Sequence, residues 1–318
     1  MLNWGIIGAG DVVRHKSGPS LATLKRSVVR HVASRRAESA RAYAEAAGVP
    51  SHGDDVGTIL SDAEIDIVYI ATPPESHAEY ATAAAAAGKH VMLEKPMCLT
   101  ASDARVVIDA CAKNHVQCFV AYYRRLHPHM VAIKSLLDSG SIGRPRLVSF
   151  RVAMATDYAD RSNWKIDRRI NGGGLFVDIA THRLDLAFFL CGAPAAVCGH
   201  AATVSPELDV EQLAVVAVKH EGGTVSTVTG EFFTGRFEDR FEIVCDNGRI
   251  SSDRLDSQEY TVETGESSTV YRPEKPEYPH IPLFSHVEDV LLDGAESLSD
   301  AETAYFTEQA LDTVVRNG

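Results

Sequence analysis

The chain has 318 residues, of which 45% are hydrophobic, so it can form two domains of ordinary size with substantial cores. Acidic residues outnumber basic ones by 43 to 31, and the net charge of -12 argues against nucleic acid as a partner. The six cysteines are scattered without a CxxC pair or a histidine at zinc spacing, so we expect reduced core thiols and no metal site.

The N-terminal residues run directly into a strand and turn pattern, "LNWGIIGAG". They lack the charged segment and the cleavage site of a secretory signal. No apolar run approaches the roughly 20 residues that a membrane span requires. We therefore expect a cytoplasmic protein with no membrane partner.

The first 120 or so residues alternate short apolar strands with longer helical patterns. The expected strands are "WGIIG", "VVRHVAS", "IDIVYIA", "HVMLE" and "QCFVAYY", with helices around 11–26, 37–47, 75–87 and 101–114. Strands that are apolar throughout are typical of a parallel sheet covered on both faces. The pattern predicts an α/β, doubly wound Rossmann domain over residues 1–121.

A glycine pair marks the first turn of this domain. Gly8 and Gly10 follow the first strand and precede a helix that begins near Asp11 and Val12. In a dinucleotide site the first glycine allows a tight turn, the second admits a pyrophosphate, and the helix N-terminus attracts its charge. Val13 stands where a third small residue is usual, and an ordinary glycine turn is the alternative. The position after the first strand favours dinucleotide binding.

The end of the second strand, "VASRR", indicates which dinucleotide is preferred. An NAD-specific site carries an acid near this point to bind the ribose hydroxyls. This chain instead has Ser34, Arg35 and Arg36, a hydroxyl and two cations that suit a 2′-phosphate. The alternative is two solvated arginines at a helix start. We expect NADP(H) to be preferred, with NAD(H) possible.

Two further segments follow the fourth and fifth strands, "ATPPESH" and "EKP". Ligands of doubly wound sheets bind at the carboxyl edge, where these segments begin. The lysine could equally be an ordinary surface residue. The cofactor-binding candidates here are Thr72, Pro73, His77, Glu94, Lys95 and Pro96.

The pattern changes after residue 121. A helix in "MVAIKSLLDSG" is followed by long strands, and "HEGG" and "CDNGR" supply glycines where hairpins need a positive φ. Strands joined by tight turns are antiparallel. We expect a C-terminal α+β domain over residues 122–318, built on a large, mostly antiparallel, open-faced sheet. Its helices within 283–318 could pack back toward the first domain.

The segment "NGGGLFVDIATHRLDLAFFL", residues 171–190, resembles a buried helix with polar intrusions. At 100° per residue, Asp178, Thr181, His182 and Asp185 fall within one arc, and the remainder is nearly all apolar. The polar stripe faces either water or a lined cleft. The three glycines would let the chain pass close to a cofactor or substrate.

Several motifs occur in order over the first 190 residues: the N-terminal GxG, "TPPESH", "AGKHVMLEKP", "YYRRLHP", "SGSIGRP" and "GGGLFVDIATH". In this combination the chain resembles the Gfo/Idh/MocA oxidoreductases. The resemblance implies a Rossmann domain followed by a largely antiparallel sheet whose open face commonly serves oligomerisation. It also implies bound NAD(P) and oxidation or reduction of sugars, cyclic polyols or related carbonyl compounds.

The resemblance also implies roles for individual residues. Lys95 is the EKP lysine, which Pro96 commonly follows through a cis peptide, and Asp178 and His182 are the DxxxH pair. Trp164, in "NWK", aligns with a tryptophan often found near the nicotinamide in relatives such as anhydrofructose reductases.

Hydride transfer requires a proton to move to or from the substrate oxygen, and histidine titrates nearest neutral pH. We expect His182 to act as acid/base and Asp178 to orient the imidazole or bind a substrate hydroxyl. Lys95 would stabilise the developing alkoxide. Either Lys95 or His182 could be the immediate proton donor.

We therefore expect an NADP(H)-dependent oxidoreductase acting on a sugar or polyol, assembled as a homodimer or homotetramer through the open sheet face. Two alternatives remain, an NAD-dependent glycosidase that acts by transient oxidation and a non-catalytic NADP-binding regulatory protein. Substrate specificity is expected to come from the loop 154–171 and from the strands of the second domain.

Overall fold

The computed structural model describes residues 1–158, 160 and 163–316, so residues 159, 161 and 162 of the expected specificity loop lie outside the described part. The chain forms two compact units, Met1–Leu126 with Pro276–Ala304, and His127–Lys275 with Tyr305–Gly318. Among the described residues, no helix combines the length and hydropathy needed to cross a membrane.

The first unit contains a parallel sheet of six strands in the order β3-β2-β1-β4-β5-β6. The order reverses direction beside β1, which makes the β1–β4 neighbourhood the switch point where doubly wound sheets bind ligands. The strands are β1 (Leu2–Ile7), β2 (Ser27–Ala33), β3 (Ser51–Gly53), β4 (Ile67–Ile70), β5 (His90–Leu93) and β6 (Cys118–Val120).

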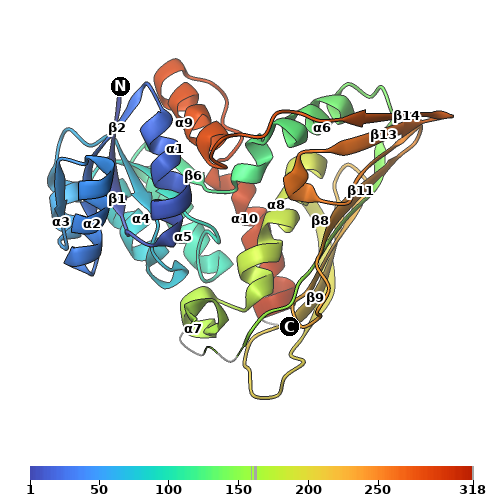
Figure 1. Ribbon diagram of the computed structural model, residues 1–318, viewed down its shortest axis with the longest axis horizontal. Helices are drawn as coiled ribbons and strands as arrows, with labels where there is room; N and C mark the ends of the chain where they lie inside the picture. The colour runs from blue at the N-terminus through green and yellow to red at the C-terminus, as the bar shows by residue number, and fades with distance from the viewer. Residues whose placement is uncertain (159, 161–162, 317–318) are drawn as a thin grey trace. The chain divides into compact units, whose positions relative to one another are not determined.

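Helices surround this sheet (Figure 1). They are α1 (Gly18–Thr23), α2 (Ala37–Ala47), α3 (Val56–Ser61), α4 (His77–Ala86), α5 (Ala101–Lys113) and α9 (Ile281–Asp293), with shorter helical turns η1 (Val13–Ser17), η2 (Pro74–Ser76) and η3 (Tyr123–Leu126). Helix α9 comes from late in the chain, and its Phe284 contacts the rings of Trp4 and Tyr69 edge-on at 5.4 and 5.6 Å. These buried aromatic contacts anchor α9 to the first unit.

The second unit contains an eight-stranded sheet in the order β14-β13-β12-β11-β7-β10-β9-β8. Only β7 and β10 pair in parallel, and all the other neighbours are antiparallel. The strands are β7 (Pro145–Ala153), β8 (Pro194–Ala202), β9 (Leu213–His220), β10 (Val225–Glu231), β11 (Glu238–Cys245), β12 (Arg249–Ser252), β13 (Tyr260–Thr264) and β14 (Ser267–Tyr271).

The helices of the second unit cover one face of this sheet. They are α6 (Pro128–Asp138), α7 (Arg168–Asn171), α8 (Thr181–Cys191) and α10 (Ala301–Leu311), of which only the part from Tyr305 on belongs to this unit, with η4 (Trp164–Ile166), η5 (Phe176–Ala180), η6 (Leu255–Ser257) and η7 (Asp312–Arg316). Side chains of α6, α8 and η7 share one core with alternate strand residues. In the part of the chain that is described, no helix covers the opposite face (Figure 1). The expected fold class is therefore confirmed.

Two details correct the sequence expectations. Gly223 in the β9–β10 turn has the expected positive φ of 85°, whereas Gly248 in the β11–β12 turn does not. A Cβ at Gly248 would lie 2.7 Å from the carbonyl oxygen of Glu263, so this glycine permits a close approach. Cys198 is exposed on β8, where alternate residues face outward, and is not a core thiol.

Candidate functional site

The turn after β1 has the geometry that a dinucleotide site requires. Gly8 adopts φ 106°, and a Cβ there would lie 2.6 Å from the carbonyl oxygen of Ala71. A Cβ at Gly10 would meet no atom within 4 Å. Gly8 is thus needed for the fold, whereas Gly10 leaves space above the turn that a pyrophosphate could approach.

The helix after this turn is not a regular α-helix. Its backbone is helical from Asp11, becomes π-helical over Val13–Ser17, and ends at Thr23 rather than near residue 26. Val13 is fully buried, so the larger residue at the third motif position packs in the core. Asp11 is exposed and Val12 half-buried at the helix start.

The end of β2 presents two cations. Ser34 is half-buried, and its amide donates to Gly53 across the sheet at 3.0 Å. Arg35 and Arg36 follow and are exposed. Within the described chain neither guanidinium has a carboxylate partner, so both remain available to an anionic group.

The ring of His77 connects two of the predicted cofactor segments through contacts with their backbone oxygens. Its ring is fully buried, with Nε2 2.8 Å from the oxygen of Thr72 and Nδ1 3.1 Å from the oxygens of both Pro96 and Met97. Burial lowers the pKa of His77, while the three carbonyl oxygens favour the protonated ring and oppose that shift. The histidine therefore braces the segment that contains the cis Lys95–Pro96 peptide.

Glu94 belongs to a buried hydrogen-bonded chain. The Tyr69 hydroxyl donates to Glu94 Oε1 at 2.6 Å and lies 2.7 Å from Ser17 Oγ, and the Lys95 amide donates to Glu94 Oε2 at 3.2 Å. Burial raises the pKa of the Glu94 carboxyl and that of the Tyr69 hydroxyl. Ser17 and Tyr69 were missed by sequence reasoning, although a tyrosine within the apolar strand "IVYI" was a visible signal.

In the second unit, Asp178 and His182 lie on one continuous helical run formed by η5 and α8. Phe176–Ala180 is π-helical, so the expected spacing of 100° per residue does not hold through Asp178. Asp178, Thr181, His182 and Asp185 are all buried within the structure. The polar stripe is therefore not an ordinary solvent-facing stripe.

The three glycines before this helix pack against the protein itself. Gly172 ends α7 in the left-handed conformation, with φ 76°. A Cβ at Gly173 would lie 2.4 Å from Val177 Cγ2, and one at Gly174 would lie 2.6 Å from the carbonyl oxygen of Glu211. The nearest neighbours at these two positions are thus atoms of the chain, so both glycines permit a close approach within the protein.

Two buried side chains fix this glycine segment. Asn171 Nδ2 donates to the oxygens of Lys165, Gly173 and Gly174 at 3.0 to 3.1 Å. Both carboxylate oxygens of Glu211 accept from the Gly174 amide, at 2.8 and 2.7 Å. Burial raises the pKa of Glu211, against the backbone donors that favour its charged form.

Lys165 pairs with the predicted site residue Asp178. Its Nζ lies 2.9 Å from Asp178 Oδ2, and also 5.9 Å from the ring centre of Trp164, which is 36% exposed. In the sequence, "NWK" predicted a role only for its tryptophan. The contact with Asp178 depends on the fold of the loop 154–171, so the lysine carried no signal of its own.

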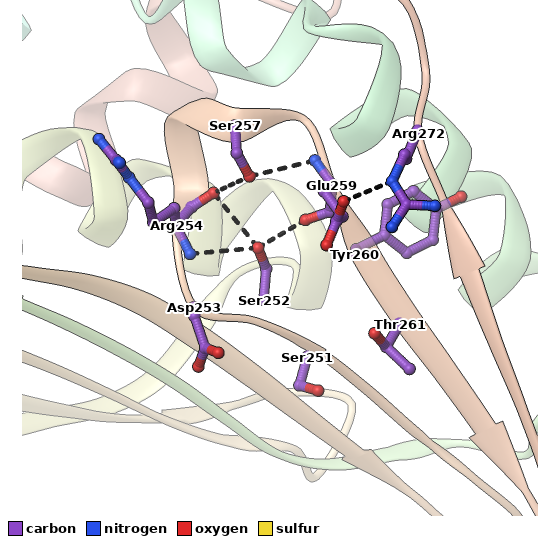
Figure 2. Close-up of a pocket in the computed structure, with 9 residues that line it drawn as sticks. All are labelled: Ser251, Ser252, Asp253, Arg254, Ser257, Glu259, Tyr260, Thr261 and Arg272. Carbon is purple, nitrogen blue, oxygen red and sulfur yellow. Dashed lines mark hydrogen bonds and ion pairs between the residues drawn. The ribbon is translucent and has the colours of Figure 1, made fainter.

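A separate pocket in the second unit has a volume of about 380 Å³. It is lined by Ser251, Ser252, Asp253, Arg254, Ser257, Glu259, Tyr260, Thr261 and Arg272 (Figure 2). Its polar groups largely bind one another, because Arg272 Nε donates to Glu259 at 2.6 Å and Ser252 Oγ donates to the oxygen of Glu259 at 2.5 Å. Predicted site residues do not line it.

Family models match both parts of the chain. Residues 2–122 match a model described as an oxidoreductase family with an NAD-binding Rossmann fold, and residues 130–251 match the GFO/IDH/MocA C-terminal domain. These two segments coincide with the parallel sheet and with most of the larger sheet. The chain belongs to the Gfo/Idh/MocA oxidoreductase family.

Individual relatives agree with this assignment. Oxidoreductase P35 of Formosa agariphila is 38% identical over 58% of this chain, but the match spans only 59% of that relative. A 1,5-anhydro-D-fructose reductase of Ensifer adhaerens is 30% identical over 79% of this chain and 75% of the relative. A solved levoglucosan dehydrogenase in complex with NADH and levoglucosan has the same fold, with a TM-score of 0.89, 24% identity, and coverage of 98% of this chain and 95% of that one.

Proposed function

We propose that this protein is an NADP(H)-dependent dehydrogenase or reductase that acts on a sugar, a cyclic polyol or a related carbonyl compound. The observation that carries the proposal is the turn after β1, where Gly8 is required by the fold and Gly10 leaves open space. That turn lies at the carboxyl edge of a doubly wound parallel sheet, where dinucleotides bind.

The residues present fit a dinucleotide. The turn at Gly8 and Gly10 and the helix start at Asp11 and Val12 would hold the pyrophosphate, and Ser34 with Arg35 and Arg36 would bind a 2′-phosphate. The segments beginning at Thr72, Pro73 and Glu94, together with Trp164, would line the rest of the cofactor site. When bound, the nicotinamide supplies or accepts the hydride.

The protein's own residues would carry out the proton transfer. His182 moves a proton to or from the substrate oxygen, and Asp178 orients the imidazole or binds a substrate hydroxyl. Lys95 places positive charge next to the oxygen on which negative charge develops. We assign both Lys95 and His182 to this reaction.

The names of two relatives support a sugar-like substrate. One is a 1,5-anhydro-D-fructose reductase, and the other is a levoglucosan dehydrogenase solved with levoglucosan. The test is an NADPH-oxidation screen over keto-sugars, aldoses, inosones and diketones, together with NADP⁺ reduction on the corresponding alcohols. We expect turnover in one direction. A protein that binds NADPH but turns over nothing in either direction would contradict the proposal.

The cofactor preference has its own test. Arg35→Ala should weaken NADPH binding by about tenfold or more while NADH binding changes little, because only NADPH carries the phosphate that a guanidinium binds. Fluorescence titration with each cofactor measures both affinities. Arg41→Ala, which removes an exposed arginine from α2, is the matched control and should change neither. Equal losses for the two cofactors would overturn the NADP(H) assignment.

We also propose assembly as a homodimer or homotetramer through the open sheet face. Leu147, Val215 and Val225 on that face are 37 to 41% exposed, and a groove of about 350 Å³ crosses strands β7, β10, β11 and β12. Burial of such apolar side chains against a second copy would be favourable. Light scattering on the wild type should give a mass that is a multiple of the chain mass. Val215→Asp should lower the mass of the assembly. A monomeric wild type would refute this assembly.

A further inference from the structure

We infer that Lys165 is a substrate-binding residue whose ammonium donates a hydrogen bond to a substrate hydroxyl beside Asp178. The inference rests on the proposed function, because it names a specificity residue of the same site. Neither the sequence motifs nor the cofactor requirements assign a role to this lysine.

The ion pair of Lys165 with Asp178 is asymmetric in exposure. The lysine side chain is 42% exposed, whereas the aspartate side chain is only 8% exposed. An ammonium group has three donors, and the 2.9 Å contact with Asp178 Oδ2 uses one of them. The ammonium of this half-exposed side chain can therefore donate to a ligand without leaving the aspartate.

The chemistry of this pair suits polyhydroxy compounds. A hydroxyl group both donates and accepts, so one hydroxyl can accept from the Lys165 ammonium while a neighbouring one donates to the carboxylate of Asp178. Hydrogen bonds to charged groups are stronger than those between neutral groups. A ligand with adjacent hydroxyls is thus favoured over one with a single hydroxyl.

The backbone of Lys165 is held in place at both ends. Its amide donates to Asn163 Oδ1 at 3.2 Å, and its carbonyl accepts from Asn171 Nδ2 at 3.0 Å. The fully buried Asn171 also binds Gly173 and Gly174, which lead into the helix that carries Asp178. One side chain therefore sets the position of Lys165 relative to Asp178, and preorganised donors of this kind bind ligands at low entropic cost.

An ordinary surface ion pair in the same unit provides the contrast. Lys134 pairs with Asp138 four residues later on α6, but that aspartate is 59% exposed. Exposed pairs of this kind contribute little to stability. Lys134→Met is therefore a matched control for Lys165→Met.

The test measures ligand binding separately from catalysis. Protein saturated with NADP⁺ is titrated with D-glucose, 1,5-anhydro-D-glucitol and myo-inositol. The change in fluorescence is assigned to Trp164, because Trp4, the other of the two tryptophans, is fully buried and should contribute a constant signal. Lys165→Met should raise the Kd for the bound polyol by about 10- to 100-fold. Lys165→Arg should restore most of the affinity, and Lys134→Met should match the wild type.

In turnover, Lys165→Met should raise KM by a similar factor while kcat changes by less than about threefold. Unchanged Kd in Lys165→Met, or a loss confined to kcat, overturns the inference. A wild type that binds none of the three polyols also overturns it. A wild type that binds one of them without any hydride transfer overturns the proposed function alone.

Discussion

Each unit of the chain contains a glycine segment that leads into a π-helical turn, but the glycines serve different purposes. After β1, Gly10 faces open space. Before η5, Gly173 and Gly174 are enclosed by Val177 and Glu211. The first segment leaves room for a ligand, whereas the second brings the backbone close to its own buried side chains.

The difference teaches that a run of glycines does not by itself indicate a ligand. What surrounds a missing Cβ decides whether the glycine admits a cofactor or fixes a helix. In this protein we assign cofactor binding to the open segment and proton transfer to the helix that the packed segment fixes. This division of roles can be tested variant by variant.

The largest expected effect tests whether His182 and Lys95 take part in the chemical step. His182→Ala and Lys95→Ala should each lower turnover by about 10²–10⁴-fold, because each removes a group that handles the proton or the developing charge. NADPH affinity in His182→Ala should stay near the wild-type value. Stopped-flow rates and fluorescence titration check the two quantities. Turnover near the wild-type value in both variants would remove the assignment.

Matched glycine substitutions test the comparison itself. Gly174→Ala should lower the free energy of unfolding by about 1–3 kcal/mol, because its Cβ would overlap the carbonyl oxygen of Glu211. Gly10→Ala should change the stability of the apoprotein by no more than about 0.5 kcal/mol yet weaken NADPH binding. Urea unfolding and NADPH titration measure both. The opposite pattern would mean that the roles of the two segments are exchanged.

The two glycine segments also show how much the sequence could predict. The first site can be predicted from local patterns, because Gly8, Gly10 and Arg35 directly follow strands that appear in the sequence as apolar runs. These strands are parallel neighbours, so their carboxyl ends lie together. The second is assembled from residues far apart in the chain. Glu211 lies 37 residues after Gly174, so no periodicity links them.

Other features were invisible to local patterns for the same reason. Helix propensity does not distinguish the π-helical turn at Phe176–Ala180 from an α-helical one. The return of α9 to the first unit depends on Phe284 meeting Trp4 and Tyr69, residues more than 200 positions earlier. The motif resemblance predicted Asp178 and His182 as site residues, whereas the contact of Lys165 with Asp178 is visible only in the folded structure.

The smallest expected effect is a pH dependence at Glu211. Burial raises the pKa of the Glu211 carboxyl in the folded protein. At pH values between the unfolded pKa, about 4.3, and this raised folded pKa, the native state therefore holds more of the proton than the unfolded chain does. The wild-type free energy of unfolding should therefore fall, relative to Glu211→Gln, as pH rises through that window up to the raised folded pKa. Urea unfolding from pH 4 to 7 measures the difference. Parallel pH profiles for the two proteins would contradict it.

Direct observation of the transferred hydride is the most decisive measurement. NADPH with both C4 hydrogens of the nicotinamide replaced by deuterium is incubated with the protein and the carbonyl compound found in the screen, and the product is analysed by mass spectrometry. The account predicts one deuterium on the new CH–OH carbon for each NADPH oxidised. Unlabelled product, or substrate conversion without net cofactor oxidation, would contradict it.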